Sequence, residues 1–136
     1  MGGNSLKRKG GKGYEKLVLW QNAYRLRKTI YEITARFPRA ELRRVSQMRD
    51  AARSVKQNIQ EGYKRRSVAE YIQALTIAQG SLGELCGDLQ DCFDDKLINE
   101  DAFQALDELS GKTDFLFNRL IRALTQKKKN GTWMSL

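Results

Sequence analysis

The sequence predicts an all-α protein built as an antiparallel, up-down-up-down four-helix bundle. Apolar residues recur at alternating steps of three and four in four successive segments, which is the pattern of amphipathic helices. The alternation typical of strands is almost absent, and the 136 residues include one proline. The length suits one domain, and short connections favour antiparallel neighbours. We place the bundle at residues 14–126, between a flexible basic tail at 1–13 and a basic, flexible tail at 127–136.

The two N-terminal helices are each predicted from one apolar stripe. Pro38 ends the first helix, because proline cannot continue it. Gly62 closes the second stripe and is expected in the left-handed conformation that ends many helices. The first stripe consists of Leu19, Ala23, Leu26, Ile30, Ile33 and Phe37, and the second of Val45, Met48, Ala52, Val55 and Ile59.

The two C-terminal helices carry clear start signals. Ser67 with Glu70 three residues later forms a capping box, and Asn99 is the expected N-cap of the last helix. Three lysines before Gly131 suit a helix C-terminus. The third stripe consists of Tyr71, Leu75, Ala78, Leu82, Leu85, Leu89 and Cys92, and the fourth of Ala102, Leu106, Leu109, Thr113, Leu116, Leu120 and Leu124.

The charge is distributed unevenly along the chain. Residues 1–66 contain 18 Lys or Arg and 5 Asp or Glu, whereas residues 67–112 contain 2 and 10, and residues 113–136 contain 5 and 1, for a net charge of +9. A basic half of this kind favours binding to polyanions, and an acidic half can pair with another copy or with a basic partner.

Several function classes find no support in the sequence. Histidine is absent, and the six-residue spacing of Cys86 and Cys92 fits neither a redox motif nor a zinc site, so we expect buried free thiols. There is no phosphate loop, and Ser54 has no histidine base, so we expect a non-enzymatic protein without metal or cofactor. No apolar run is long enough for a membrane span or signal peptide, which predicts a cytoplasmic protein with no membrane partner.

Basic residues in the first half form the candidate nucleic-acid surface. On the second helix they lie along one flank of the apolar stripe and continue into the following turn, and on the first helix they are interleaved with Trp20, Tyr24 and Tyr31. Cations beside aromatic rings suit phosphates and unpaired bases, and RNA is the polyanion we expect. The alternatives are a solvated charged face and rings that widen the core or fill an interface. The candidate residues are Arg27, Lys28, Arg49, Arg53, Lys56, Lys64, Arg65 and Arg66.

Two groups of residues are candidates for contact between helices or subunits. A strip of small residues runs along the third helix, away from its apolar stripe, where glycine is costly unless another helix approaches closely; local flexibility is the alternative. On the second helix, polar residues beside the core are expected to hydrogen-bond to another helix or subunit. The first group is Thr76, Gly80, Gly83 and Gly87, and the second is Ser54, Asn58 and Glu61.

Four segments in the same order resemble a known family: LVLWQNAYRL, the FP that ends the first helix, QMRDAARSVKQNIQEG and EYIQALTIAQGSLGEL. The chain is similar, over about residues 14–125, to the four-helix-bundle proteins of 23S ribosomal RNA intervening sequences, which are related to accessory variability proteins of diversity-generating retroelements. Lys56 stands where the family often has proline. The matching positions are Ser54, Asn58, Ile59, Glu61 and Gly62, followed by Gly80, Ser81, Glu84 and Leu85.

The resemblance implies a bundle that assembles into a ring-like homopentamer. In the retroelement branch the pentamer is basic and binds a reverse transcriptase and nucleic acid. Two hypotheses follow for this chain. It is an oligomeric RNA-binding bundle, or it is a protein-interaction adaptor that docks on a reverse transcriptase as its accessory subunit.

Overall fold

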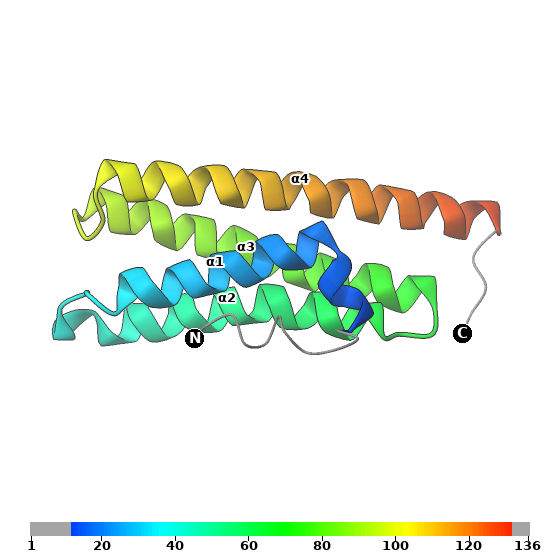
Figure 1. The fold of residues 1–136 in the computed structure, drawn as a ribbon, viewed down its shortest axis with the longest axis horizontal. Coiled ribbons are helices and arrows are strands. Elements are labelled where there is room, and N and C mark those ends of the chain that lie inside the picture. The colour runs from blue at the N-terminus through cyan, green and yellow to red at the C-terminus, as the bar shows by residue number, and fades with distance from the viewer. Residues whose placement is uncertain (1–11, 132–136) are drawn as a thin grey trace.

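The computed structural model describes residues 12–131 and is helical throughout that range, with no strand. Short 3-10 helices at Gly13–Lys16 and Arg39–Glu41 precede the first two long helices (Figure 1). The long helices are α1 (Val18–Thr34), α2 (Leu42–Tyr63), α3 (Val68–Asp94) and α4 (Glu100–Asn130). The all-α class and the four predicted helices are confirmed.

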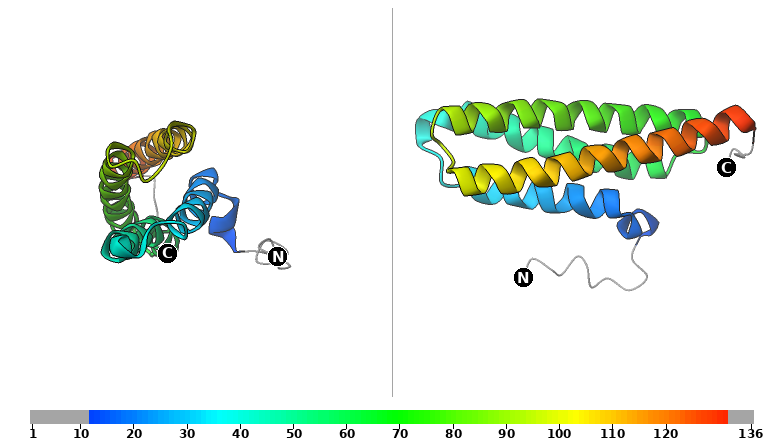
Figure 2. Two further views of the ribbon diagram at one scale, coloured as in Figure 1. Left: turned by 90° about the vertical axis from the view of Figure 1, so that its left-hand side faces the viewer. Right: turned by 90° about the horizontal axis from the view of Figure 1, so that it is seen from above.

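Successive helices lie alongside one another through most of their length. Seen from the end, the chain passes from α1 through α2 and α3 to α4, and α1 and α4 face each other across the more open side (Figure 2). Two contacts far apart along the helices set α2 against α3: Met48 meets Cys92, and Tyr63 meets Tyr71. Residue numbers therefore rise along α2 as they fall along the facing part of α3.

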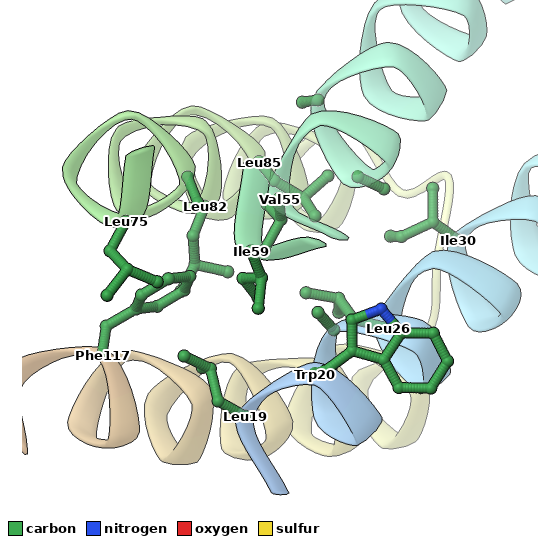
Figure 3. Close-up of a cluster of buried hydrophobic side chains, with 14 of the residues drawn as sticks. Leu19, Trp20, Leu26, Ile30, Val55, Ile59, Leu75, Leu82, Leu85 and Phe117 are labelled. Atoms are coloured by element: carbon green, nitrogen blue, oxygen red, sulfur yellow. The ribbon is translucent and has the colours of Figure 1, made fainter. Parts of the chain in front are cut away.

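The predicted stripes of α1, α2 and α3 form most of the core. Side chains from all four helices meet in its centre, where Phe117 of α4 points toward Leu75 and Leu82 of α3 (Figure 3). Every residue of the α3 stripe is buried. The members of the other two stripes that are buried are Leu19, Ala23, Leu26, Ile30, Met48, Ala52, Val55, Ile59 and Gly62.

The predicted stripe of α4 is wrong in part. Leu109 and Leu116 are only half-buried, whereas Ser110 and Phe117, which the stripe left out, are buried. In the middle of α4, the buried residues are thus shifted by one position from the predicted stripe. The physical reason is that Leu109 and Leu116 face the groove between α1 and α4 instead of the centre of the bundle.

Both predicted N-caps of the later helices are confirmed. Ser67 Oγ accepts from Glu70 N at 3.2 Å, and Asn99 Oδ1 accepts from Ala102 N at 2.8 Å. At the other end, α4 closes on Gly131, which has a φ of 68°. The helix continues to Asn130, past the bundle boundary that we placed at 126, and its last turn holds the three lysines.

Gly62 differs from its prediction. It lies within α2 and is buried, and Gly131 is the described glycine with a positive φ. A Cβ at Gly62 would lie 2.9 Å from Ala74 Cβ and 2.9 Å from Tyr71 Cδ1. The absent side chain therefore lets α2 and α3 approach each other at this end of the bundle.

Within the described range, no helix combines the length and apolar character needed to cross a membrane. Most of the predicted N-terminal tail, residues 1–11, and the end of the C-terminal tail, residues 132–136, lie outside the described residues. Gly13, which we assigned to the first tail, begins a 3-10 helix.

Candidate nucleic-acid interface

The contact between α1 and α2 has a well-defined register. Trp20 Nε1 of α1 donates to Gln60 Oε1 of α2 at 2.9 Å, and toward the other end Tyr31 packs against Arg49. From the first contact to the second, the residue number rises along α1 by as much as it falls along α2. The residue opposite any position between them can therefore be read from this register. The same register sets Arg27 opposite Arg53 and Tyr24 opposite Lys56.

Five of the predicted basic residues belong to this contact, and we call them the basic seam. Arg27 comes from α1, and the α2 members follow one another at helical steps, with Gln60 filling the remaining position on the same face. The basic seam consists of Arg27, Arg49, Arg53, Lys56 and Lys64. The two helices thus gather charges that the sequence places far apart.

Arg49 is the most firmly held member of the basic seam. Its Nε donates to Thr34 Oγ1 at 3.0 Å, its Nη2 donates to the carbonyl of Tyr31 at 3.1 Å, and its guanidinium lies 4.5 Å from the centre of the Tyr31 ring. The Tyr31 carbonyl lies in the last turn of α1 and also accepts from Ala35 N at 3.2 Å. Arg49 therefore fixes the end of α1 to α2 in addition to supplying a positive charge.

Lys56 is half-buried at the middle of the basic seam. Its Nζ donates to Gln60 Oε1 at 2.9 Å and to Gln57 Oε1 at 3.3 Å, and neither acceptor carries a charge. Burial, together with the positive charges of Arg27 and Arg53, lowers the pKa of Lys56 below its usual value. The protonated ammonium is thus held in an environment that disfavours it.

The central cations of the basic seam have no carboxylate to balance them. Arg27, Arg53 and Lys56 form no ion pair with any of residues 12–131. Arg44, by contrast, pairs with Glu41 at 2.8 Å and with Asp95 at 3.0 Å near the other end of α2. The prediction of a basic ridge with few acidic partners therefore holds at the centre of the seam.

The aromatic residues of α1 serve mainly in packing. Trp20 is 5% exposed and stacks on Tyr24 with ring centres 5.2 Å apart. Tyr31 is half-buried, and the guanidiniums of Arg27 and Arg49 each lie 4.5 Å from its ring centre. The alternative that the rings widen the core is confirmed for Trp20, whereas Tyr31 orients two cations.

The remaining predicted cations, Arg65, Arg66 and Lys28, lie beyond the Lys64 end of the seam and on its outer side. Lys64, Arg65 and Arg66 are exposed where α2 leads into α3, and Lys64 Nζ lies 5.9 Å from the Tyr14 ring centre. Lys28 is half-buried on the outer side of α1, in a shallow hollow that Tyr24 also lines. The predicted surface is thus one band that crosses α1, α2 and the following turn.

Ser54 and Asn58 are engaged within the chain. Ser54 Oγ lies 2.8 Å from Ser81 Oγ of α3, and Asn58 Nδ2 donates to Ser54 Oγ at 3.1 Å and to the Ser54 carbonyl at 2.9 Å. Of the two interpretations that the sequence left open, contact between helices is seen for Ser54, whereas both hydrogen bonds of Asn58 stay within α2. Glu61, the third member of the group, is exposed.

The small-residue strip of α3 faces outward. Thr76, Gly80, Gly83 and Gly87 are all exposed, and a Cβ at any of the three glycines would have no atom within 4 Å. Packing within the bundle therefore does not require these glycines. The whole of α3 contains no Lys or Arg, so its outer surface is acidic.

A groove of about 1010 Å³ lies between α1 and α4. It is lined by the half-buried Leu109 and Leu116 and by Val18 and Phe115, which are 57% and 60% exposed. Arg25 stands at its α1 side. No sequence pattern indicates this groove, because it depends on how far apart α1 and α4 lie.

The two thiols are free. Cys92 is buried with Sγ 3.6 Å from Met48 Sδ, and Cys86 is half-buried. Burial raises the pKa of both thiols, which keeps them protonated at neutral pH. The expectation of buried thiols is confirmed for Cys92 and only in part for Cys86.

These features define a helical bundle of four long helices with an unbalanced cationic seam between the first two. The family of 23S rRNA-intervening sequence proteins matches residues 15–118, and the chain belongs to this family. No curated protein is significantly similar to the chain. A crystal structure of a protein of unknown function from the S23 ribosomal protein family of Bacteroides thetaiotaomicron has the same fold, with a TM-score of 0.71 and 20% identity. The similarity covers 76% of this chain and 98% of that one.

Proposed function

We propose that this protein is a non-enzymatic, antiparallel four-helix bundle that self-associates into a ring and binds RNA in the cytoplasm. The basic seam, with Lys28, Arg65 and Arg66 beside it, is the RNA-binding surface. The observation that carries the proposal is the group of Arg27, Arg53 and Lys56, which forms no ion pair with any carboxylate of residues 12–131. The family's link to ribosomal RNA genes agrees with an RNA partner.

Electrostatics favours a polyanion at this surface. Neighbouring like charges repel, and the lowered pKa of Lys56 reflects its burial first and then its repulsion by Arg27 and Arg53. A phosphate near the basic seam replaces this repulsion with attraction and releases counterions from the RNA. Because phosphate contacts carry no sequence information, binding is expected to be weakly sequence-selective.

A salt titration tests this function. If the seam makes roughly four phosphate contacts to single-stranded RNA, its affinity falls about 50-fold between about 50 and 200 mM salt. Filter binding or fluorescence anisotropy with a fluorescent RNA measures this directly. An affinity that does not change with salt would exclude phosphate binding by the seam.

We propose that the groove between α1 and α4 receives α3 of a second copy. The strip at Gly80, Gly83 and Gly87 gives α3 a narrow outer face, and the groove presents apolar side chains that such a face can cover. The contact joins two different surfaces of the protein, so each copy can bind two others. Successive copies close into a ring when the rotation between neighbouring subunits permits it. Five subunits is the number that the family resemblance implies.

The mass in solution tests the self-association. A Gly83→Leu variant keeps the fold, because nothing lies within 4 Å of the added Cβ, but it thickens the face that enters the groove. Its mass by light scattering should fall to that of one chain, 15.6 kDa, while an exposed control on α4, Gln104→Leu, should keep the mass of the assembly. If Gly83→Leu has the mass of the native protein, the strip is not the interface.

Purification with nuclease treatment separates RNA binding from the adaptor hypothesis. If the protein copurifies with RNA and releases its partners after nuclease treatment, RNA is the direct ligand. If a reverse transcriptase stays bound after the treatment and free RNA does not bind, the basic seam instead docks on that enzyme.

A further inference from the structure

The centre of the basic seam has a geometry of its own. Two fixed contacts, Trp20 with Gln60 and Tyr31 with Arg49, set the register of α1 on α2. Between them, Arg27 of α1 lies opposite Arg53 of α2, and Lys56 follows Arg53 by one helical turn. The three positive charges come from two helices and lie near enough that Arg27 and Arg53 both act electrostatically on Lys56.

Two of these side chains are held in place by uncharged neighbours. The Arg27 guanidinium lies 4.5 Å from the centre of the Tyr31 ring. Gln60 Oε1 accepts hydrogen bonds from both Lys56 Nζ and Trp20 Nε1, each at 2.9 Å, so the buried indole orients the amide that orients the ammonium. This support reduces the freedom that Arg27 and Lys56 would lose on binding a ligand.

The same region has many unused hydrogen-bond donors. Each guanidinium has five N–H groups, and neither Arg27 nor Arg53 donates a hydrogen bond to any of residues 12–131. The acceptors around Lys56 are amide oxygens, which offset none of its charge. A small tetrahedral anion binds where several N–H donors and an unneutralised positive charge lie together.

We propose that Arg27, Arg53 and Lys56 form a discrete binding site for one phosphate group. The two guanidiniums supply paired N–H donors, and the Lys56 ammonium supplies a localised charge. The site deepens the proposed function and depends on it for its biological ligand. The phosphate is either an internal phosphodiester of RNA or a terminal phosphate, since both present negatively charged non-bridging oxygens that accept N–H donors.

Titration with inorganic phosphate tests the site. At constant ionic strength, with chloride as the replaced anion, phosphate should shift the NMR signals of Lys56 Cε–Hε and Arg27 Nε–Hε in a saturable way. Arg53→Gln should weaken this binding about tenfold, the loss expected for one charge-assisted contact. Arg122→Gln, which removes one exposed charge from α4, should leave it unchanged.

Two RNA oligonucleotides identify the source of the phosphate. One carries a 5′-phosphate and the other a 5′-hydroxyl, with the same sequence. If both displace inorganic phosphate equally, the site takes an internal phosphodiester. If only the phosphorylated oligonucleotide displaces it, the site takes a terminal phosphate.

The outcomes separate this inference from the proposed function. If phosphate gives no saturable shift, or if Arg53→Gln binds it as the native protein does, the discrete site is overturned. Salt-sensitive RNA binding would in that case still support the wider seam. If phosphate binds as expected and no RNA binds at any salt concentration, the site stands and the proposed function fails.

Discussion

The Gly62→Ala substitution tests the packing that brings the basic turn after α2 close to α3. The added Cβ would lie 2.9 Å from Ala74 Cβ and from Tyr71 Cδ1, which is about 0.6–1.1 Å closer than carbon atoms at their best separation. Both neighbours are buried and belong to a helix, so relief requires a shift of backbone. Overpacking of this kind costs about 1–3 kcal/mol.

A gain in helix propensity offsets part of that cost. Alanine is up to about 1 kcal/mol better than glycine within a helix. We therefore expect the free energy of unfolding to fall by about 0–2 kcal/mol and the Tm by up to about 10 °C, because a chain of this size loses a few degrees per kcal/mol. Urea and thermal unfolding, followed by circular dichroism, measure both quantities.

Gly111→Ala is the matched control. Gly111 lies within α4, and a Cβ there would have no atom within 4 Å. Because Gly111 also lines the groove between α1 and α4, both variants are compared as single chains, where the control should stabilise the protein by up to about 1 kcal/mol through helix propensity. If Gly62→Ala stabilises the protein as Gly111→Ala does, the close approach of α2 and α3 at Gly62 is refuted.

Three further predictions concern single residues. Lys96 has a φ of 63° in the turn after α3, a backbone conformation that strains residues other than glycine. Lys96→Gly should therefore raise the free energy of unfolding by about 1 kcal/mol in urea titrations. A loss of stability would show that the backbone at Lys96 is not strained. Burial and the nearby Tyr63 raise the pKa of Tyr71 to about 12 from 10.0, so between these values the folded chain binds more protons than the unfolded one. The stability should therefore fall as the pH rises above about 10, and Tyr71→Phe should lose less stability over that range than the native protein, which unfolding curves at successive pH values will show. Lys56→Met should raise the free energy of unfolding, because it removes a repelled and half-buried charge, and should lower RNA affinity in the same preparation. A variant that loses both stability and affinity would indicate that Lys56 mainly supports the fold.

Helices and most of the core could be predicted from the sequence because their signals are local. Ser67 and Asn99 could be assigned as N-caps because serine and asparagine favour that position. The α3 stripe keeps one period along its whole length, so its buried residues could be predicted too. The α4 stripe failed in its middle, because Leu109 faces the groove while Phe117 fills the centre. That choice depends on the distance between α1 and α4, which no local pattern contains.

The basic seam was predicted in composition but not in arrangement. Arg53 and Lys56 fall on one face of a helix by spacing alone, whereas their nearness to Arg27 depends on the register between α1 and α2. The role of Arg49 in fixing the end of α1 depends on the same register. Gly62 was misassigned because glycine near the end of a helix serves both as a C-terminal residue and at a close approach of helices.

Charge reversal at two positions tests the central claim that the basic seam binds RNA. Arg53→Glu with Lys64→Glu and Arg119→Glu with Arg122→Glu each lower the net charge from +9 to +5, and all four residues are exposed. The measurement is the dissociation constant for one RNA at one salt concentration. We predict that the seam variant loses RNA binding while the α4 variant keeps most of it. Equal losses in the two variants would mean that net charge, and not the seam between α1 and α2, holds the RNA.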